Sequence, residues 1–206
     1  MIRLPILALL SALLGCRPYH APPATAAAPV TPATPEVQET ASCASVGVTL
    51  PAGFSEAQDV ALPIWPTPYA PVQAPWNGGV QNGKSCVART TSDVVIYRVF
   101  GGPAGQMGYW WSPNNPTALY AGASEWRAAN AVCASFNDAT QLAACTLPIG
   151  TAVYLGPTQS IVTVTDGAVS CLYPANDVAL QINLTKALPD TTPCTVEDTP
   201  PEWRGK

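Results

Sequence analysis

Histidine is almost missing from this chain: the single one, His20, lies in a stretch rich in proline and alanine near the start. A domain without histidine cannot build a Ser-His-Asp or Cys-His catalytic site, and it cannot bind zinc through imidazole. The sequence also has no CxxC pair, no Walker loop and no GxGxxG motif. We therefore expect no metal site and no required cofactor.

Charged residues are also scarce: only 11% of the residues are Asp, Glu, Lys or Arg. The formal net charge is −4, and the three lysines, Lys84, Lys186 and Lys206, are far apart in the sequence. Proteins that bind nucleic acid present a basic patch or stripe, and none is visible here. Nucleic acid is therefore not an expected partner.

Long hydrophobic runs are missing too. The longest apolar segment, residues 4–14, is interrupted by Pro5 and Ser11, and it is too short for a membrane-spanning helix, which needs about 20 apolar residues. With Arg3 before it, the run has the size of the hydrophobic region of a signal peptide. We expect residues 1–15 to be a signal peptide.

The end of this segment, Leu13-Leu14-Gly15-Cys16, resembles the lipobox of bacterial lipoproteins. The resemblance implies cleavage before Cys16 and acylation of that cysteine with chains such as palmitate. Two or more acyl chains give a stable membrane anchor. Since Arg17 follows rather than Asp, the resemblance implies a cell-envelope lipoprotein anchored in the outer membrane, facing the periplasm or the cell surface. An ordinary signal peptide followed by a chance cysteine is the alternative.

Residues 16–42 are dominated by Pro, Ala and Thr and show no apolar periodicity. Such a segment cannot bury enough surface to offset its chain entropy, so we expect a disordered, semi-rigid tether. Residues 43–206 then form the globular domain, which is long enough for one sizeable core.

Six cysteines remain in that domain after Cys16 is set aside: Cys43, Cys86, Cys133, Cys145, Cys171 and Cys194. An even set in an exported chain predicts three disulfides, with fifteen pairings open. From their positions near the two ends of the domain, we expect Cys43 and Cys194 to pair.

The predicted secondary structure is β-rich. Runs of β-branched and aromatic residues predict strands at 93–100, 151–155, 160–165 and 178–184. Asp166-Gly167 is typical of a hairpin turn. One helix is predicted at 124–137, with one face formed by Trp126, Ala129, Cys133 and Phe136. Residues 43–83 are expected to be irregular, and residues 189–206 a polar tail. The fold class is α+β, a single domain with one main helix.

The order of several segments resembles the ADP-ribosyltransferase-like and NAD-glycohydrolase domains of bacterial toxins. The matching pieces are YRVFGGPAG at 97–105, GYWWSP at 108–113, LPIGTAVYLG at 147–156 and LQINL at 180–184. The resemblance implies NAD as substrate and a site in which Arg98, Ser112 and Gln181 converge on one cleft.

The resemblance also implies individual roles. Arg98 would bind the pyrophosphate, Ser112 would lie near the ribose, and the nicotinamide would stack on the aromatic residues Tyr109, Trp110 and Trp111. Gln181 would stand where transferases have a catalytic glutamate. Glutamine lacks that negative charge, which indicates glycohydrolysis or a binding protein without turnover.

Other interpretations stay open. Arg98 could be a structural arginine, Gln181 a solvent-facing strand residue, and one of Trp110 and Trp111 part of the core. The chain contains six tryptophans, which also suit a glycan- or peptidoglycan-binding module with tryptophans along one open sheet face. A structural envelope lipoprotein without any small-molecule site is the third alternative.

Overall fold

A computed structural model describes residues 41–58, 79–81, 83–165, 168–184, 188–189 and 191–204, together with the backbone of residues 72–73. The expected signal peptide, Cys16, the tether and the turn residues Asp166 and Gly167 lie outside these ranges. Within them, no helix has both the length and the apolar character needed to cross a bilayer.

The larger of two main sheets has seven strands. Its main path runs in the order β1 (Phe54–Glu56), β4 (Cys86–Thr90), β8 (Ala152–Thr158), β11 (Asn176–Asn183) and β6 (Trp110–Trp111). These neighbours are antiparallel. Two short strands complete the sheet: β2 (Val72–Gln73) runs parallel to β3 (Val80–Gln81), which also pairs with β8. The expectation of irregular structure at 43–83 therefore missed these short strands.

The second sheet has three antiparallel strands, in the order β12 (Cys194–Asp198), β7 (Gln141–Leu147) and β5 (Val94–Phe100). The sequence predicted β5 almost to the residue, because it is a run of β-branched and aromatic residues. It did not predict β7. It also described the C-terminal stretch as a polar tail, whereas β12 pairs with β7 throughout its length.

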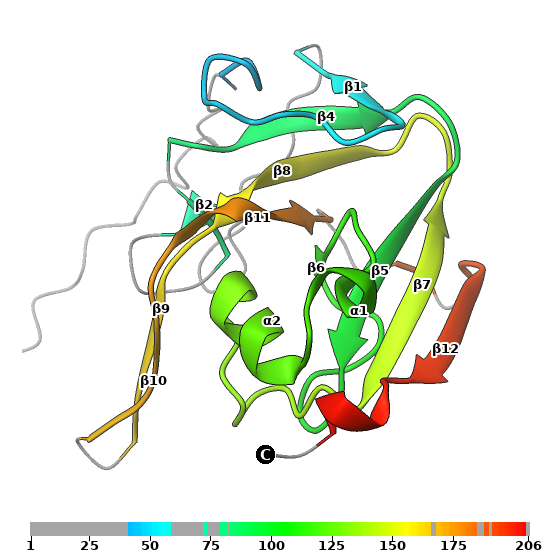
Figure 1. The fold of residues 1–206 in the computed structure, drawn as a ribbon. Helices are drawn as coiled ribbons and strands as arrows, with labels where there is room; N and C mark the ends of the chain where they lie inside the picture. Colours follow the sequence, from blue (N-terminus) through cyan, green and yellow to red (C-terminus); the bar gives the residue numbers. More distant parts are fainter. Residues whose placement is uncertain are drawn as a thin grey trace, which may run out of the picture. The chain divides into compact units, whose positions relative to one another are not determined.

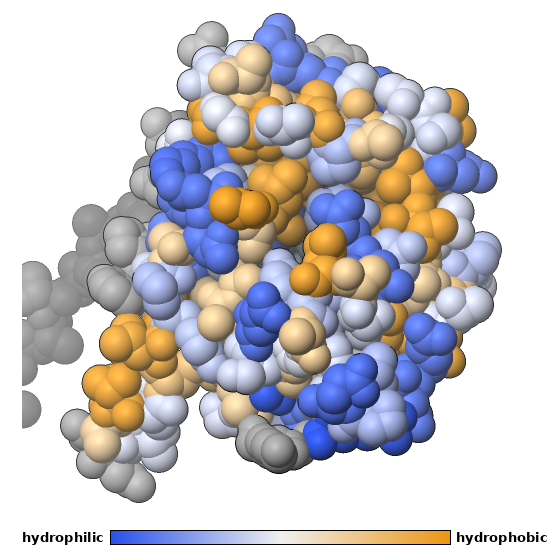
Figure 2. Space-filling view, in the orientation of Figure 1, coloured by the Kyte–Doolittle hydropathy of each residue, from blue (hydrophilic) through white to orange (hydrophobic). Residues whose placement is uncertain are grey.

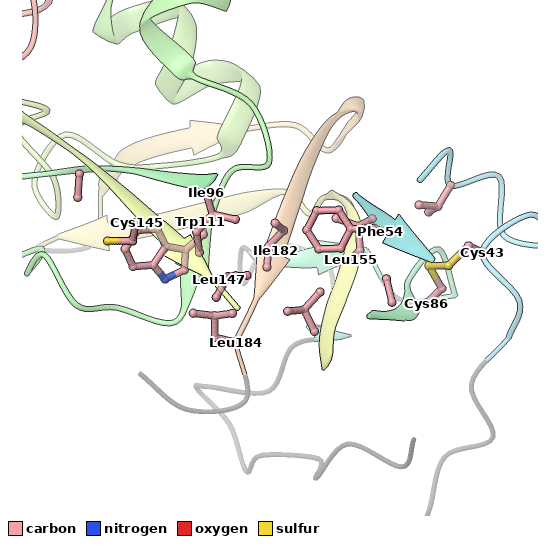
Figure 3. Close-up of a cluster of buried hydrophobic side chains, with 14 of the residues drawn as sticks. Cys43, Phe54, Cys86, Ile96, Trp111, Cys145, Leu147, Leu155, Ile182 and Leu184 are labelled. Atoms are coloured by element: carbon pink, nitrogen blue, oxygen red, sulfur yellow. A yellow bond between two sulfur atoms is a disulfide. The ribbon is translucent and has the colours of Figure 1, made fainter. Parts of the chain in front are cut away.

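The main core contains side chains from both sheets (Figure 3). Ile96 of β5, Leu147 of β7, Leu155 of β8 and Ile182 of β11 are all fully buried, and each such side chain contributes about 1.5–3 kcal/mol relative to an exposed one. This shared core fixes β5 relative to β11, the two strands that carry Arg98 and Gln181.

Two α-helices follow β6: α1 (Pro116–Leu119) and α2 (Ala123–Asn130). Trp126 of α2 packs against Trp203 in the short 3-10 helix η1 (Pro201–Trp203), with 6.1 Å between ring centroids. The predicted helix at 124–137 is too long, because Ala131 takes a left-handed conformation with φ 49°. The chain beyond it forms turns, so Cys133 and Phe136 do not share a helix face with Trp126.

A separate two-stranded hairpin, β9 (Ile161–Thr165) and β10 (Ala168–Tyr173), joins β8 to β11. It extends beside α2 at the lower left of Figure 1. Its cross-strand register places four aliphatic side chains on one face, Val162 with Leu172 and Val164 with Val169. This face is partly solvent-exposed, and the hairpin carries apolar surface in Figure 2.

Three disulfides hold the domain together, in agreement with the prediction from six cysteines. They pair Cys43 with Cys86, Cys133 with Cys171 and Cys145 with Cys194. The expected Cys43–Cys194 pair is wrong, because the Cys43 N–H bonds to Glu56 of β1 and its Sγ lies beside Val87 of β4, while Cys194 lies opposite Cys145 on β7. The structure thus confirms a β-rich α+β domain stapled by disulfides.

Candidate functional site

A pocket of about 650 Å³ lies among β5, β6, α2, the turns that follow α2, and the β9–β10 hairpin. This volume is in the range of small-molecule sites. Most of its lining is apolar or aromatic. The lining side chains considered below are Arg98, Val99, Tyr109, Trp110, Trp111, Ser112, Trp126, Asn130, Val132, Cys133, Phe136, Ile161, Thr163 and Gln181.

Among the described residues that line the pocket, Arg98 is the only charged one. Its Nε donates a hydrogen bond to the carbonyl of Gly105 (2.8 Å), and its Nη1 donates to the carbonyl of Trp110 (2.7 Å). No described carboxylate forms an ion pair with it, and Nη2 makes no hydrogen bond to a described residue. Burial lowers the pKa of the guanidinium to about 10, so it stays positively charged at neutral pH.

The two adjacent tryptophans have different roles, as the alternation of side chains along a strand requires. Trp111 lies in the main core, and its Nε1 donates to the carbonyl of Gly108 at 2.7 Å. Trp110 is half-buried on the pocket wall and holds Arg98 through its carbonyl. Tyr109, also half-buried, precedes them on the same wall.

Ser112 lines the pocket, but its hydroxyl is used locally. Its Oγ donates to the carbonyl of Asn114 (2.7 Å) and accepts from the Asn114 N–H (3.2 Å). Its backbone forms two hydrogen bonds with Tyr97 that join β6 to β5. Ser112 therefore shapes the turn after β6 and fixes it against the strand that carries Arg98.

Gln181 is buried, and it does not face solvent as a surface strand residue would. Its Nε2 donates to the carbonyl of Asn130, the last residue of α2, at 2.9 Å. Arg98, Ser112 and Gln181 thus line one pocket, although they come from three different elements. No Asp, Glu or His is among the described residues that line it.

Sequence reasoning missed the remaining wall, which includes Trp126, Val132 and Phe136 from α2 and the turns beyond, and Ile161 and Thr163 from the hairpin. The Cys133–Cys171 disulfide joins these two segments, and Cys133 Sγ lies 3.7 Å from Thr163 Oγ1. The only indication in the sequence was the presence of Cys133 and Cys171, and the sequence did not show that these two cysteines pair with each other.

The described residues contain no cluster of three or more His, Cys, Asp or Glu side chains that could hold a metal ion. Comparisons of the chain with protein-family models, with curated proteins and with solved structures find no match.

Proposed function

We propose that the domain is a binding module for a small organic anion, held at the cell envelope by a lipid anchor on Cys16. The observation that carries the binding proposal is Arg98. It is a half-buried cation on the wall of an aromatic pocket, with no described carboxylate as partner. A buried charge is stable only when it is paired or well hydrogen-bonded.

The hydrogen-bonding of Arg98 fits this role. Two carbonyls fix the orientation of the guanidinium plane, while its Nη2 has no partner among the described residues. Arginine donors on a fixed plane suit carboxylate or phosphate oxygens. Arg127 is also bonded to a carbonyl, but it does not line the pocket, so Arg98 is the arginine that a ligand in the pocket can reach.

Binding without turnover is the form of this function that the pocket supports best. The resemblance to ADP-ribosyltransferase-like domains makes NAD one ligand to test. Transfer or hydrolysis of its glycosidic bond would need a negative charge near the developing cation. Gln181 cannot supply that charge, and its amide is already engaged with Asn130.

The glycan-binding alternative needs exposed tryptophans on an open face, since sugars stack on accessible rings. Trp111, Trp126 and Trp203 are each 6% exposed or less. Among the tryptophans that the structure describes, only Trp110 is available, and it belongs to the pocket. This arrangement favours a small-ligand pocket over a sugar-binding platform.

Calorimetric titration of the exported chain tests the binding proposal. We would use the Cys16→Ser form, which removes the acylation site and leaves the described domain unchanged. NAD, ADP-ribose and simple carboxylates would be titrated at low salt. Arg98→Gln should lose at least tenfold in affinity for any anion that binds. The control is Arg204→Gln, because Arg204 also bonds a carbonyl, that of Thr199, but does not line the pocket. No binding of any anion, or equal binding by Arg98→Gln, would refute the proposal.

The anchor proposal has a separate test. Mass spectrometry of the mature N-terminus should find an acylated Cys16, and Cys16→Ser should move the protein from the membrane fraction to the soluble fraction. Cleavage at another residue, or an unmodified Cys16, would refute it without affecting the binding proposal.

A further inference from the structure

We infer that the ligand of this pocket is an amphiphile with one anionic group, such as a medium-chain carboxylate, and not a dinucleotide. This inference rests on the proposed binding function, and it identifies the ligand class.

The first argument is charge. The described part of the lining holds one cation, Arg98, whereas a dinucleotide has a pyrophosphate with two negative charges. Another arginine, Arg127, is buried and donates from both Nε and Nη2 to the carbonyl of Asn137. Arg127 does not line the pocket. A single guanidinium matches a single carboxylate, which it can bind with two parallel hydrogen bonds.

The second argument is the apolar wall. Val99, Trp126, Val132, Phe136 and Ile161 line the pocket and come from β5, α2, the turns after α2 and β9. Phe136 is 55% exposed, so part of this wall meets water when no ligand is bound. A ligand that covers this surface gains about 0.8 kcal/mol of binding free energy for each methylene group that it buries. The wall therefore favours a ligand with an apolar body. Adenine and two riboses would instead need many more hydrogen-bonding partners.

The third argument is the small set of polar side chains. Ser112 uses its hydroxyl in the turn with Asn114, and the Asn130 Nδ2 donates to the carbonyl of Trp126. Gln181 Nε2 is bound to Asn130. These three side chains therefore offer few free donors to sugar hydroxyls. A ligand with one polar end and an apolar body matches what remains.

The test uses the exported chain carrying Cys16→Ser and a series of hexanoate, octanoate and decanoate, each below its micelle concentration. Calorimetry should show an affinity that rises about fourfold with each added methylene, which is 0.8 kcal/mol converted to an equilibrium constant. Decanol, which has the same chain without the charge, should bind at least tenfold more weakly than decanoate. Arg98→Gln should remove that difference, and Arg98→Lys should retain part of it.

Substitutions at two similarly exposed apolar residues test whether the apolar wall of the pocket contacts the ligand. Phe136→Ala should weaken the dependence on chain length, because Phe136 lines the pocket. Leu119→Ala should not, because Leu119 is similarly exposed at 57% but lies on α1 outside the lining. Both substitutions are at exposed positions, so both variants should fold.

The outcomes separate the two proposals. If NAD or ADP-ribose binds in a way that depends on Arg98, and the carboxylates show no dependence on chain length, the amphiphile inference is wrong while the binding function stands. If neither class binds, both are wrong. If decanol binds as tightly as decanoate, the pocket takes apolar molecules without using Arg98, and the inference is again overturned.

Discussion

Gly108 lies against the guanidinium of Arg98, so that a Cβ built on Gly108 would lie 2.3 Å from Arg98 Cζ. No real Cβ makes such a contact. The absence of a side chain at position 108 is therefore what allows Arg98 to lie along the loop and reach the carbonyls of Gly105 and Trp110.

Gly108→Ala should displace Arg98 and weaken anion binding about tenfold or more, with little cost in stability, because the guanidinium is the far end of a flexible side chain and can move aside. Gly105→Ala is the matched control. It keeps the carbonyl that accepts from Arg98, and its Cβ would meet nothing within 4 Å. Titration and thermal unfolding of both variants would check this. Equal effects of the two substitutions would contradict the placement of Arg98.

The pH dependence of binding follows from the same side chain. Burial lowers the pKa of Arg98 to about 10, below its ordinary value, so the guanidinium is protonated below that pH and loses its charge above it. Affinity for a carboxylate ligand should be constant from pH 6 to pH 9, since carboxylates are ionised throughout this interval, and should fall as the pH rises through about 10. The weaker binding by Arg98→Gln should show no such fall. A step in wild-type affinity near pH 7 would indicate that another titrating group controls binding.

Two buried asparagines should respond to substitution with opposite signs. Asn183 is 1% exposed, and neither polar atom of its side chain has a hydrogen-bond partner among the residues that the structure describes. Asn183→Leu should therefore stabilise the domain by about 1 kcal/mol, because it removes an unsatisfied buried amide. Asn137 donates from Nδ2 to the carbonyl of Val99 and accepts at Oδ1 from the N–H of Ala139. Asn137→Leu should destabilise it by about 2 kcal/mol or more.

Denaturant unfolding of Asn183→Leu and Asn137→Leu would measure the two changes in the free energy of unfolding. A loss of stability in Asn183→Leu would mean that an ordered water or a ligand group satisfies this amide in solution.

Removing the Cys133–Cys171 disulfide should loosen the pocket wall more than the rest of the domain. The two cysteines are 38 residues apart in the sequence. For a loop of that length, the chain-entropy model gives a stabilisation of about 4 kcal/mol. A two-stranded hairpin is marginal by itself, so Cys133→Ala with Cys171→Ala should speed amide exchange in β9 and β10 while β8 and β11 stay protected. The control is Cys43→Ala with Cys86→Ala, which opens the bridge between Cys43 and β4 and leaves the hairpin's own disulfide intact. Uniform exchange in both double variants would contradict this.

The strands that the sequence predicted are those whose own residues favour extended backbone, such as Val94–Phe100. The strand at Gln141–Leu147 was missed because its Ala-Ala-Cys centre has low strand propensity. It forms because small, buried side chains fit between β5 and β12, where Cys145 also bonds to Cys194. The end of α2 at Asn130 could not be predicted either, since the residue that stops it, Ala131, is an excellent helix former.

The sequence predicted only some of the residues that line the pocket, because the others are brought there by tertiary structure. Arg98, Trp110 and Gln181 were named because the order of segments resembles a known family. Phe136 and Ile161 were not, because their proximity depends on the Cys133–Cys171 pairing. The sequence leaves that pairing open among fifteen.

The disulfide connectivity has a consequence for how the protein matures. Cys43 and Cys86 are the first two domain cysteines in chain order, but the other bridges interleave, since Cys145 lies between Cys133 and Cys171. If the chain is exported from its N-terminus and oxidised as it emerges, neighbouring cysteines would give Cys133–Cys145 and Cys171–Cys194. Both pairs are non-native, and thiol–disulfide exchange must then rearrange them. Production in a cell that lacks a disulfide isomerase should therefore yield a correct first bridge and a scrambled pocket wall.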